Sequence, residues 1–110
     1  MIAKSVLAAG ILVLGTGFAH ADTAPTKDSM KGAWFVYSDG NKLGRVLISL
    51  NGTIKATKTN GEKDVGHWRI TPNDRYCVTF KKWGDGAEHC SDLRIDAQGV
   101  AHGNGFSARR

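Results

Sequence analysis

The sequence has few of the features that identify an enzyme or a membrane protein. Its 110 residues include two cysteines and two prolines. It contains no phosphate-binding glycine loop, no Gly-x-Ser-x-Gly elbow and no His-Glu-x-x-His zinc helix. A chain of this length forms one domain and little more. These properties exclude a multidomain enzyme, a membrane channel and a cytosolic nucleotide-binding fold.

The one long apolar run lies at the beginning of the chain. Lys4 precedes an uncharged segment at 5–19, and Ala-His-Ala follows at 19–21. This order is typical of a secretory signal peptide with a small-x-small cleavage site. The run is shorter than the roughly 20 residues that a membrane-spanning helix needs, and no cysteine follows the site for lipid attachment. We predict a signal peptide at 1–21, a lead-in at 22–31 that is flexible or forms one helical turn, and an antiparallel β domain at 32–110.

Both cysteines fall in the part that would be exported to the periplasm or secreted. Thiols pair in such oxidising compartments. Cys77 and Cys90 are too far apart for a Cys-x-x-Cys motif, and no cluster of His or Cys completes a zinc site. We therefore predict a structural disulfide, no metal and no cofactor. Closing a loop of this size stabilises a protein by about 3 kcal/mol.

Turn signals divide the rest of the chain. Pairs such as Asp39-Gly40, Asn51-Gly52 and Asn60-Gly61 recur about every 9 to 13 residues, a spacing typical of consecutive antiparallel strands. The segments between them are rich in β-branched and aromatic residues. The sequence predicts an all-β fold, a small antiparallel meander of about seven strands that forms an incompletely closed barrel or a sandwich. The predicted strands are 33–38, 43–50, 53–59, 65–70, 76–82, 88–95 and 100–106.

Alternation of side chains assigns the faces of these strands. Val46, Ile48 and Leu50 share the inner side of one strand. The candidate core or pocket residues are Trp34, Trp68, Tyr76, Phe80 and His89.

The cysteines suggest a register for one hairpin. If Cys77 lies opposite Cys90, Arg75 faces Asp92 on the outer side and apolar residues meet inside. This register puts the disulfide on the outer face and leaves a four-residue loop at 82–85. The alternative is a slipped register with the loop at 85–86.

The order of several short motifs resembles that of a known family. The motifs are Gly32-Ala33-Trp34, Ser38-Asp39-Gly40, Gly66-His67-Trp68, Cys77-Val78-Thr79-Phe80 and Cys90. In this order they resemble small exported proteobacterial proteins of unknown function, over about residues 31–93. The first Gly-x-Trp is also similar to that of calycins, the superfamily of lipocalins and avidins, where it seals one end of a barrel. The resemblance implies export and a β fold, and it supplies no catalytic residues.

Few side chains suggest chemistry. His89 faces inward by alternation, and we expect a core histidine satisfied by a hydrogen bond rather than a metal or haem ligand. Asp85, Glu88 and Asp92 crowd the same hairpin. We interpret them as solvated acids neutralised by basic neighbours rather than as a catalytic pair.

Basic residues follow several strands on their outer side: Lys42, Arg45, Lys55, Lys58, Lys63, Lys81 and Lys82. Basic edge strands prevent sheet-to-sheet aggregation, which is one interpretation of this pattern. The other is attraction to an acidic partner or an anionic envelope polymer. Export removes the usual nucleic-acid partner.

Trp83 stands at the predicted hairpin tip, where the turn does not need an apolar ring. It either covers the disulfide or serves as an exposed anchor for a partner. The sequence therefore predicts a non-enzymatic exported binding module that recognises a protein or an envelope component. It makes no stable membrane insertion after signal cleavage. The candidate binding surface is Lys81, Lys82, Trp83 and Asp85. The alternatives are an inhibitor of a secreted hydrolase, such as a protease or lysozyme, and a carrier of a small apolar ligand.

Overall fold

The computed structural model describes residues 22–110, which form one antiparallel sheet and a short helix. The elements are α3 Lys27–Met30, β2 Gly32–Ser38, β3 Asn41–Ile48, β4 Thr53–Lys58, β5 Lys63–Ile70, β6 Tyr76–Phe80, the 3₁₀ turn η2 Trp83–Gly86, β7 Glu88–Ser91, β8 Arg94–Ile95, β9 Ala101–Gly103 and β10 Phe106–Arg109. The signal peptide predicted at 1–21 lies outside the described residues. The helical turn that the sequence allowed in the lead-in is α3.

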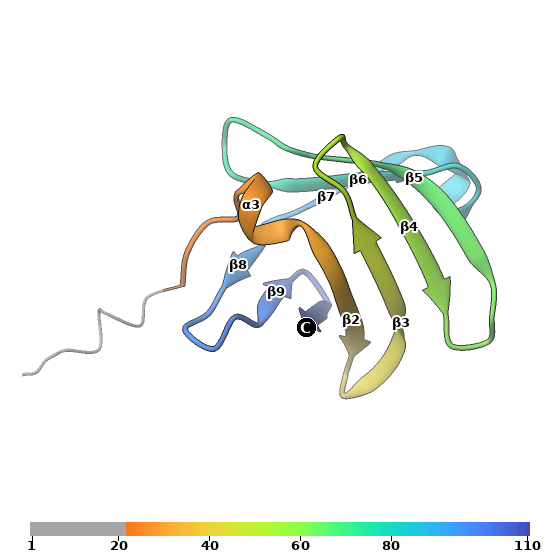
Figure 1. The fold of residues 1–110 in the computed structure, drawn as a ribbon, viewed down its shortest axis with the longest axis horizontal. Helices are drawn as coiled ribbons and strands as arrows, with labels where there is room; N and C mark the ends of the chain where they lie inside the picture. Colours follow the sequence, from red (N-terminus) through yellow and green to blue (C-terminus); the bar gives the residue numbers. More distant parts are fainter. Residues whose placement is uncertain (1–21) are drawn as a thin grey trace, which may run out of the picture.

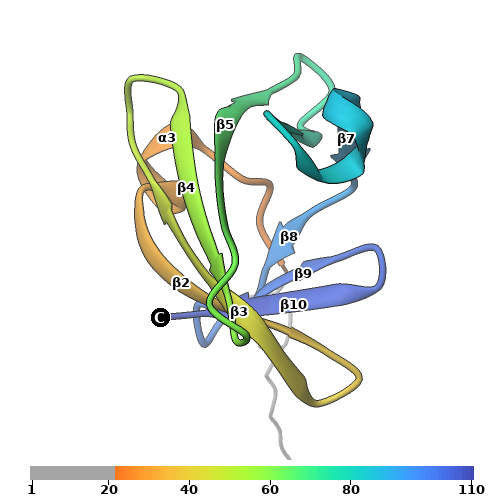
Figure 2. The ribbon, with the colours of Figure 1, turned by 90° about the vertical axis from the view of Figure 1, so that its right-hand side faces the viewer.

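The strands are arranged as an up-and-down meander that curls on itself. Their order in the sheet is β7-β6-β5-β4-β3-β2-β10-β9-β8. The pairing of β10 with β2 joins the two ends of the meander. The consecutive strands β7 and β8 are not hydrogen-bonded to each other, so the sheet is a half-barrel that is open along this seam (Figures 1 and 2). The all-β class and the incomplete closure are as predicted, but the strand number is nine rather than seven.

Two predicted strands are each divided in two. Residues 88–95 separate into β7 and β8 because β6 begins only at Tyr76, so the chain beyond Ser91 has no partner in β6 and pairs with β9 instead. Residues 100–106 contain a two-residue turn at Asn104 and Gly105, where Gly105 has a φ of 79°. Such Asn-Gly turns favour tight hairpins. A smaller correction concerns Leu50, which is 50% exposed because β3 ends two residues earlier, at Ile48.

Glycine allows neighbouring strands to approach closely as the sheet curls. A Cβ atom at Gly66 in β5 would collide with the backbone carbonyl of Thr79 in β6. A Cβ atom at Gly44 in β3 would meet the carbonyl of Thr57 in β4 in the same way. Larger residues at these two positions would force the strands apart.

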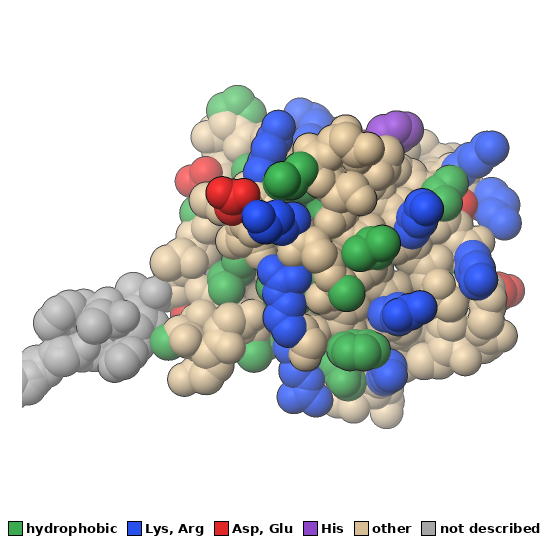
Figure 3. Space-filling view, viewed as in Figure 1, with side chains coloured by type: hydrophobic (Ala, Val, Ile, Leu, Met, Phe, Trp, Pro, Cys, Tyr) green, Lys and Arg blue, Asp and Glu red, His purple; other side chains and the backbone are tan. Residues whose placement is uncertain are grey.

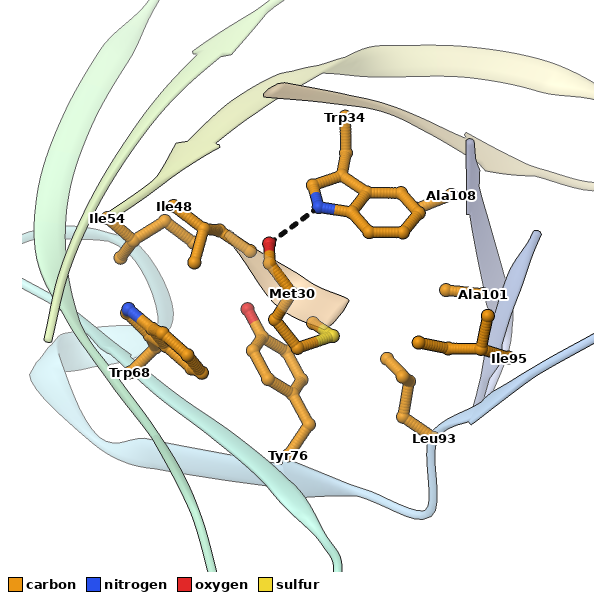
Figure 4. Packing of buried hydrophobic residues seen from close by; sticks show 10 residues of the cluster. All are labelled: Met30, Trp34, Ile48, Ile54, Trp68, Tyr76, Leu93, Ile95, Ala101 and Ala108. Atoms are coloured by element: carbon orange, nitrogen blue, oxygen red, sulfur yellow. Dashed lines mark hydrogen bonds between the residues drawn. The ribbon is translucent and has the colours of Figure 1, made fainter. Parts of the chain in front are cut away.

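The concave side of the half-barrel carries the core. Trp34 is 3% exposed and Trp68 is 5% exposed. Thr26 and Ser29 form a capping box that begins α3 and positions Met30 over the concave side. Figure 4 shows Met30 between Trp34 and Tyr76, with the Trp34 indole Nε1 donating a hydrogen bond of 2.7 Å to the Met30 carbonyl. The short helix is therefore part of the core.

Candidate functional site

An apolar cavity of about 500 Å³ lies inside the half-barrel. Its walls come from nearly every strand, and Met30 of α3 contributes to them. The apolar lining residues include Trp34, Val36, Val46, Ile48, Ile54, Val78, Phe80, Leu93, Ala101, Phe106 and Ala108. The volume is within the range of small-molecule pockets in proteins. The curl of the sheet thus produces a space that a small ligand can enter.

Four polar side chains border this cavity: Tyr76, His89, Ser91 and Asn104. Tyr76 is 9% exposed, and burial raises the pKa of its phenol, so the hydroxyl stays protonated. Within residues 22–110 this hydroxyl has no side-chain hydrogen-bond partner, yet its oxygen is not one of the fully buried, unpaired atoms. The oxygen therefore reaches the accessible surface of the cavity, where water or a bound molecule can pair with it. The Tyr76 hydroxyl is therefore the polar group best placed to orient a ligand.

His89 lies opposite Val78, as the register predicted. Its side chain is exposed at the edge of the cavity rather than buried in the core. Its imidazole packs close to Gly84, where an added Cβ would lie 2.7 Å from Nε2. His89 is therefore a residue of the cavity entrance. The expectation of a buried core histidine was wrong because β7 is an edge strand at the open seam and has a hydrogen-bonded neighbour on one side alone.

The disulfide joins Cys77 and Cys90 on neighbouring strands, in the predicted register. Cys77 is fully buried. Glu88 lies close enough that its carboxylate and the two sulfur atoms form the one group of three potential metal ligands among residues 22–110. Since both sulfur atoms belong to the disulfide, this group has no thiolate to offer a metal.

Two ion pairs flank the disulfide. The Arg69 guanidinium donates two hydrogen bonds of 2.8 Å to the Glu88 carboxylate and holds the pKa of Glu88 below its ordinary value. Arg75 Nε lies 3.1 Å from Asp92 Oδ1. Two of the three acids near this hairpin are thus paired with arginine, in agreement with their interpretation as neutralised acids.

The hairpin tip is longer than predicted. Hydrogen-bonded pairing ends at Thr79 and Glu88, and the connection runs over residues 81–87 rather than 82–85. Gly84, Asp85 and Gly86 all have positive φ values, between 58° and 71°. The connection is longer than four residues because Phe80 and Ala87, which the predicted register pairs, are not paired.

The buried carboxylate of Asp64 in β5 holds this tip in place. Its Oδ2 accepts hydrogen bonds from the backbone N–H groups of Lys82, at 2.8 Å, and Trp83, at 2.9 Å. Burial alone would raise the pKa of Asp64, but these donors and the N–H of Val65 hold it below its ordinary value. Asp64 was not predicted as a site residue. The available signal was an acidic residue directly before the predicted strand 65–70, at a position that shares the side of Gly66 and Trp68 by alternation.

Trp83 is half-buried and does not cover the disulfide. Its ring packs against Phe80, with ring centroids 5.1 Å apart, and the Lys58 ammonium lies 4.7 Å from its centroid. Phe80 is on the inner side of β6, whereas the disulfide is on the outer side. The neighbouring Lys81, Lys82 and Asp85 are exposed. The structure therefore separates the predicted binding surface into a packed ring and an exposed charged rim.

Further features bear on location and on relatives. A disulfide of this kind indicates a non-cytoplasmic location. None of the helices in residues 22–110 has the length and hydrophobicity of a membrane-spanning segment. No family model matches the chain, and neither a curated protein nor a solved structure is significantly similar to it.

Proposed function

We propose that this protein is a non-enzymatic binding module, exported to the periplasm or secreted, that holds a small and largely apolar ligand in its half-barrel. The observation that carries the proposal is the cavity of about 500 Å³, whose walls are mostly apolar side chains. Contacts with such walls favour an apolar molecule of drug-like size. The cavity faces solvent on the side of the opening between β7 and β8, where His89 is exposed.

Tyr76 supplies the polar part of the recognition. Its hydroxyl is protonated and borders the accessible space of the cavity, so it would donate a hydrogen bond to a ligand carbonyl, ether or hydroxyl oxygen. A ligand that leaves this group unsatisfied would bind less tightly. The proposed ligand is therefore an apolar molecule with one oxygen acceptor.

A titration with a neutral fluorescent dye, N-phenylnaphthylamine, tests the cavity. The dye has no charge, so the positive surface does not attract it. Val78→Phe places a larger side chain in the cavity, and we expect it to abolish the dye's fluorescence increase. The matched control is Val65→Phe, which makes the same change on the exposed outer side and should leave binding unchanged.

Equal dye binding by Val78→Phe and Val65→Phe would contradict the proposal.

Tyr76→Phe tests the polar contact, with other ligands in place of the dye. This variant should weaken the binding of a ketone by about tenfold, the effect of one hydrogen bond, and should change the binding of the hydrocarbon of the same size much less. Circular dichroism would verify that each variant is folded.

The hairpin tip supports a second candidate, recognition of a protein partner, including inhibition of a secreted hydrolase. Asp64 fixes the backbone of this tip, while Lys81, Lys82 and Asp85 remain exposed. A loop that is already ordered loses little entropy on binding. Capture from a periplasmic extract with wild type and Lys81→Glu/Lys82→Glu as baits tests this candidate, because a partner of the tip is retained only by the wild type.

A further inference from the structure

The outer face of strands β2 to β5 alternates cationic and apolar side chains. In one cross-strand row, Phe35, Arg45, Thr57 and Lys63 lie side by side. In the next row, Ala33, Leu47, Lys55 and Val65 do the same. We call the exposed members of these rows, Phe35, Arg45, Leu47, Lys55, Lys63 and Val65, the outer patch. Figure 3 shows blue and green side chains interspersed over this face, with red ones at its margins.

The charge of the outer patch is of one sign. Among the residues of β2 to β5 the only carboxylate is Asp64, and it is buried on the inner side. Lys58 and Arg69 of these strands have acidic partners, Glu62 and Glu88. No carboxylate of residues 22–110 lies within ion-pair distance of Arg45, Lys55 or Lys63. These three cations are therefore free to attract an anionic partner.

Protection of a sheet edge does not explain these cations. The edges of the sheet are β7 and β8, whereas β3, β4 and β5 each have hydrogen-bonded neighbours on both sides. A central strand has no unpaired backbone groups that need shielding from another sheet. The positive charge of the outer patch thus requires a different explanation.

The apolar members of the patch are also unusually exposed. Leu47 is 49% exposed, Val65 is 48% exposed and Phe35 is 38% exposed. Lys42 Nζ lies 4.5 Å from the centroid of the Phe35 ring, which adds a further cation at the margin. Apolar side chains between cations are typical of surfaces that rest on a bilayer, where the cations meet headgroups and the apolar groups enter the acyl boundary. The binding of a soluble polyanion would require the cations but not the apolar side chains.

From this arrangement we infer that the outer patch docks the protein on the surface of a bilayer that contains anionic phospholipids. The contact is peripheral, since the patch lies on folded strands and its side chains reach no deeper than the boundary between headgroups and acyl chains. It uses the convex side of the sheet, whereas the cavity lies on the concave side. The inference is therefore independent of the proposed ligand.

Sedimentation with lipid vesicles tests the docking. We expect the protein to bind vesicles of phosphatidylethanolamine and phosphatidylglycerol, and to bind phosphatidylcholine vesicles far less. Lys55→Glu/Lys63→Glu should weaken binding to the anionic vesicles by about tenfold or more, because each cation near such a surface contributes about 1 kcal/mol. The matched control, Lys27→Glu/Lys31→Glu, makes the same charge change outside the four strands and should bind nearly as wild type.

A second variant separates the bilayer from other anionic partners. Leu47→Ser/Val65→Ser keeps every charge, and we expect it to weaken vesicle binding without affecting folding, since both side chains are half exposed. Three outcomes would overturn the inference. The first is equal binding to the anionic and the phosphatidylcholine vesicles. The second is an equal loss of vesicle binding in the two charge-reversal variants. The third is binding to soluble polyglutamate that is as tight as vesicle binding and that the serine variant does not weaken.

Discussion

The carboxylate of Asp64 accepts a hydrogen bond from the backbone N–H of Trp83, 2.9 Å away, across 19 residues of sequence. The same oxygen accepts the N–H of Lys82, and the other accepts the N–H of Val65. One buried side chain thus satisfies three backbone donors and ties the hairpin tip to β5. Buried donors left without a partner destabilise a protein, so Asp64 is important for the order of the tip.

Asp64→Asn should therefore lower the thermal unfolding midpoint at neutral pH. The asparagine side chain has one accepting oxygen, and its amide would face N–H donors that need an acceptor. Thermal melts followed by circular dichroism measure the difference. The control is Asp85→Asn, which removes a charge from an exposed residue at the same tip and should leave the midpoint unchanged.

The pH dependence of that difference has a definite sign. Because the folded state lowers the pKa of Asp64, its stabilising contribution is complete above the ordinary value of 3.8 and is lost as pH falls through the lower folded value. The pKa values of Glu88 and Asp96 are lowered too, but both proteins share these groups. The difference in thermal unfolding midpoint between wild type and Asp64→Asn should narrow as pH falls below 3.8. A difference in midpoint that stays constant down to acid unfolding would contradict this role for the Asp64 charge.

The two buried tryptophans should dominate the stability of the core. Trp34→Ala and Trp68→Ala should each lower the free energy of unfolding by about 3 to 5 kcal/mol, the usual range for a large buried aromatic residue. Trp34→Phe keeps an aromatic ring but loses the hydrogen bond to the Met30 carbonyl, so it should lower the free energy of unfolding by about 1 kcal/mol. Urea unfolding measures these values. Leu47→Ala is the control, since its side chain is half exposed and the change should be small.

The disulfide should be a large contributor to stability. Cys77→Ala/Cys90→Ala removes a link between residues 13 apart and should lower the free energy of unfolding by about 3 kcal/mol. Urea unfolding of this variant and of the oxidised wild type measures the loss of free energy of unfolding.

We also expect the intact mass of the exported protein to correspond to a chain that begins at Asp22 and has two fewer hydrogens than the reduced chain. Two titratable thiols in that protein would contradict the pairing.

The sequence predicted the features that depend on alternation and on nearby residues. Period-two patterns and Gly-containing turns are local, so the all-β class and most strand bounds could be derived from them. The register of the disulfide hairpin followed from the requirement that Cys77 meet Cys90 while opposite charges pair. Asn104 and Gly105 form an Asn-Gly turn signal of the same local kind, and this signal predicts the division of the seventh predicted strand.

The features that the sequence did not predict depend on contacts between distant segments. The role of Asp64 requires that the tip fold back on β5, which no local pattern indicates. The cavity depends on how far the sheet curls and on the position of Met30, which α3 brings from outside the sheet. The central position of the basic strands became clear only from the strand order, and it changes the interpretation of their charge.

The role of Trp83 can be decided by comparing stability with partner capture. Its ring contacts Phe80 and lies beneath Lys58, while Asp64 holds only its backbone. Trp83→Ala should thus leave the loop in place but remove these ring contacts, and should lower the free energy of unfolding by about 1 to 2 kcal/mol. Lys82→Ala, a neighbouring exposed change, should have little effect. An unchanged unfolding midpoint for Trp83→Ala, together with loss of a partner that the wild type retains, would show instead that the ring is a binding anchor.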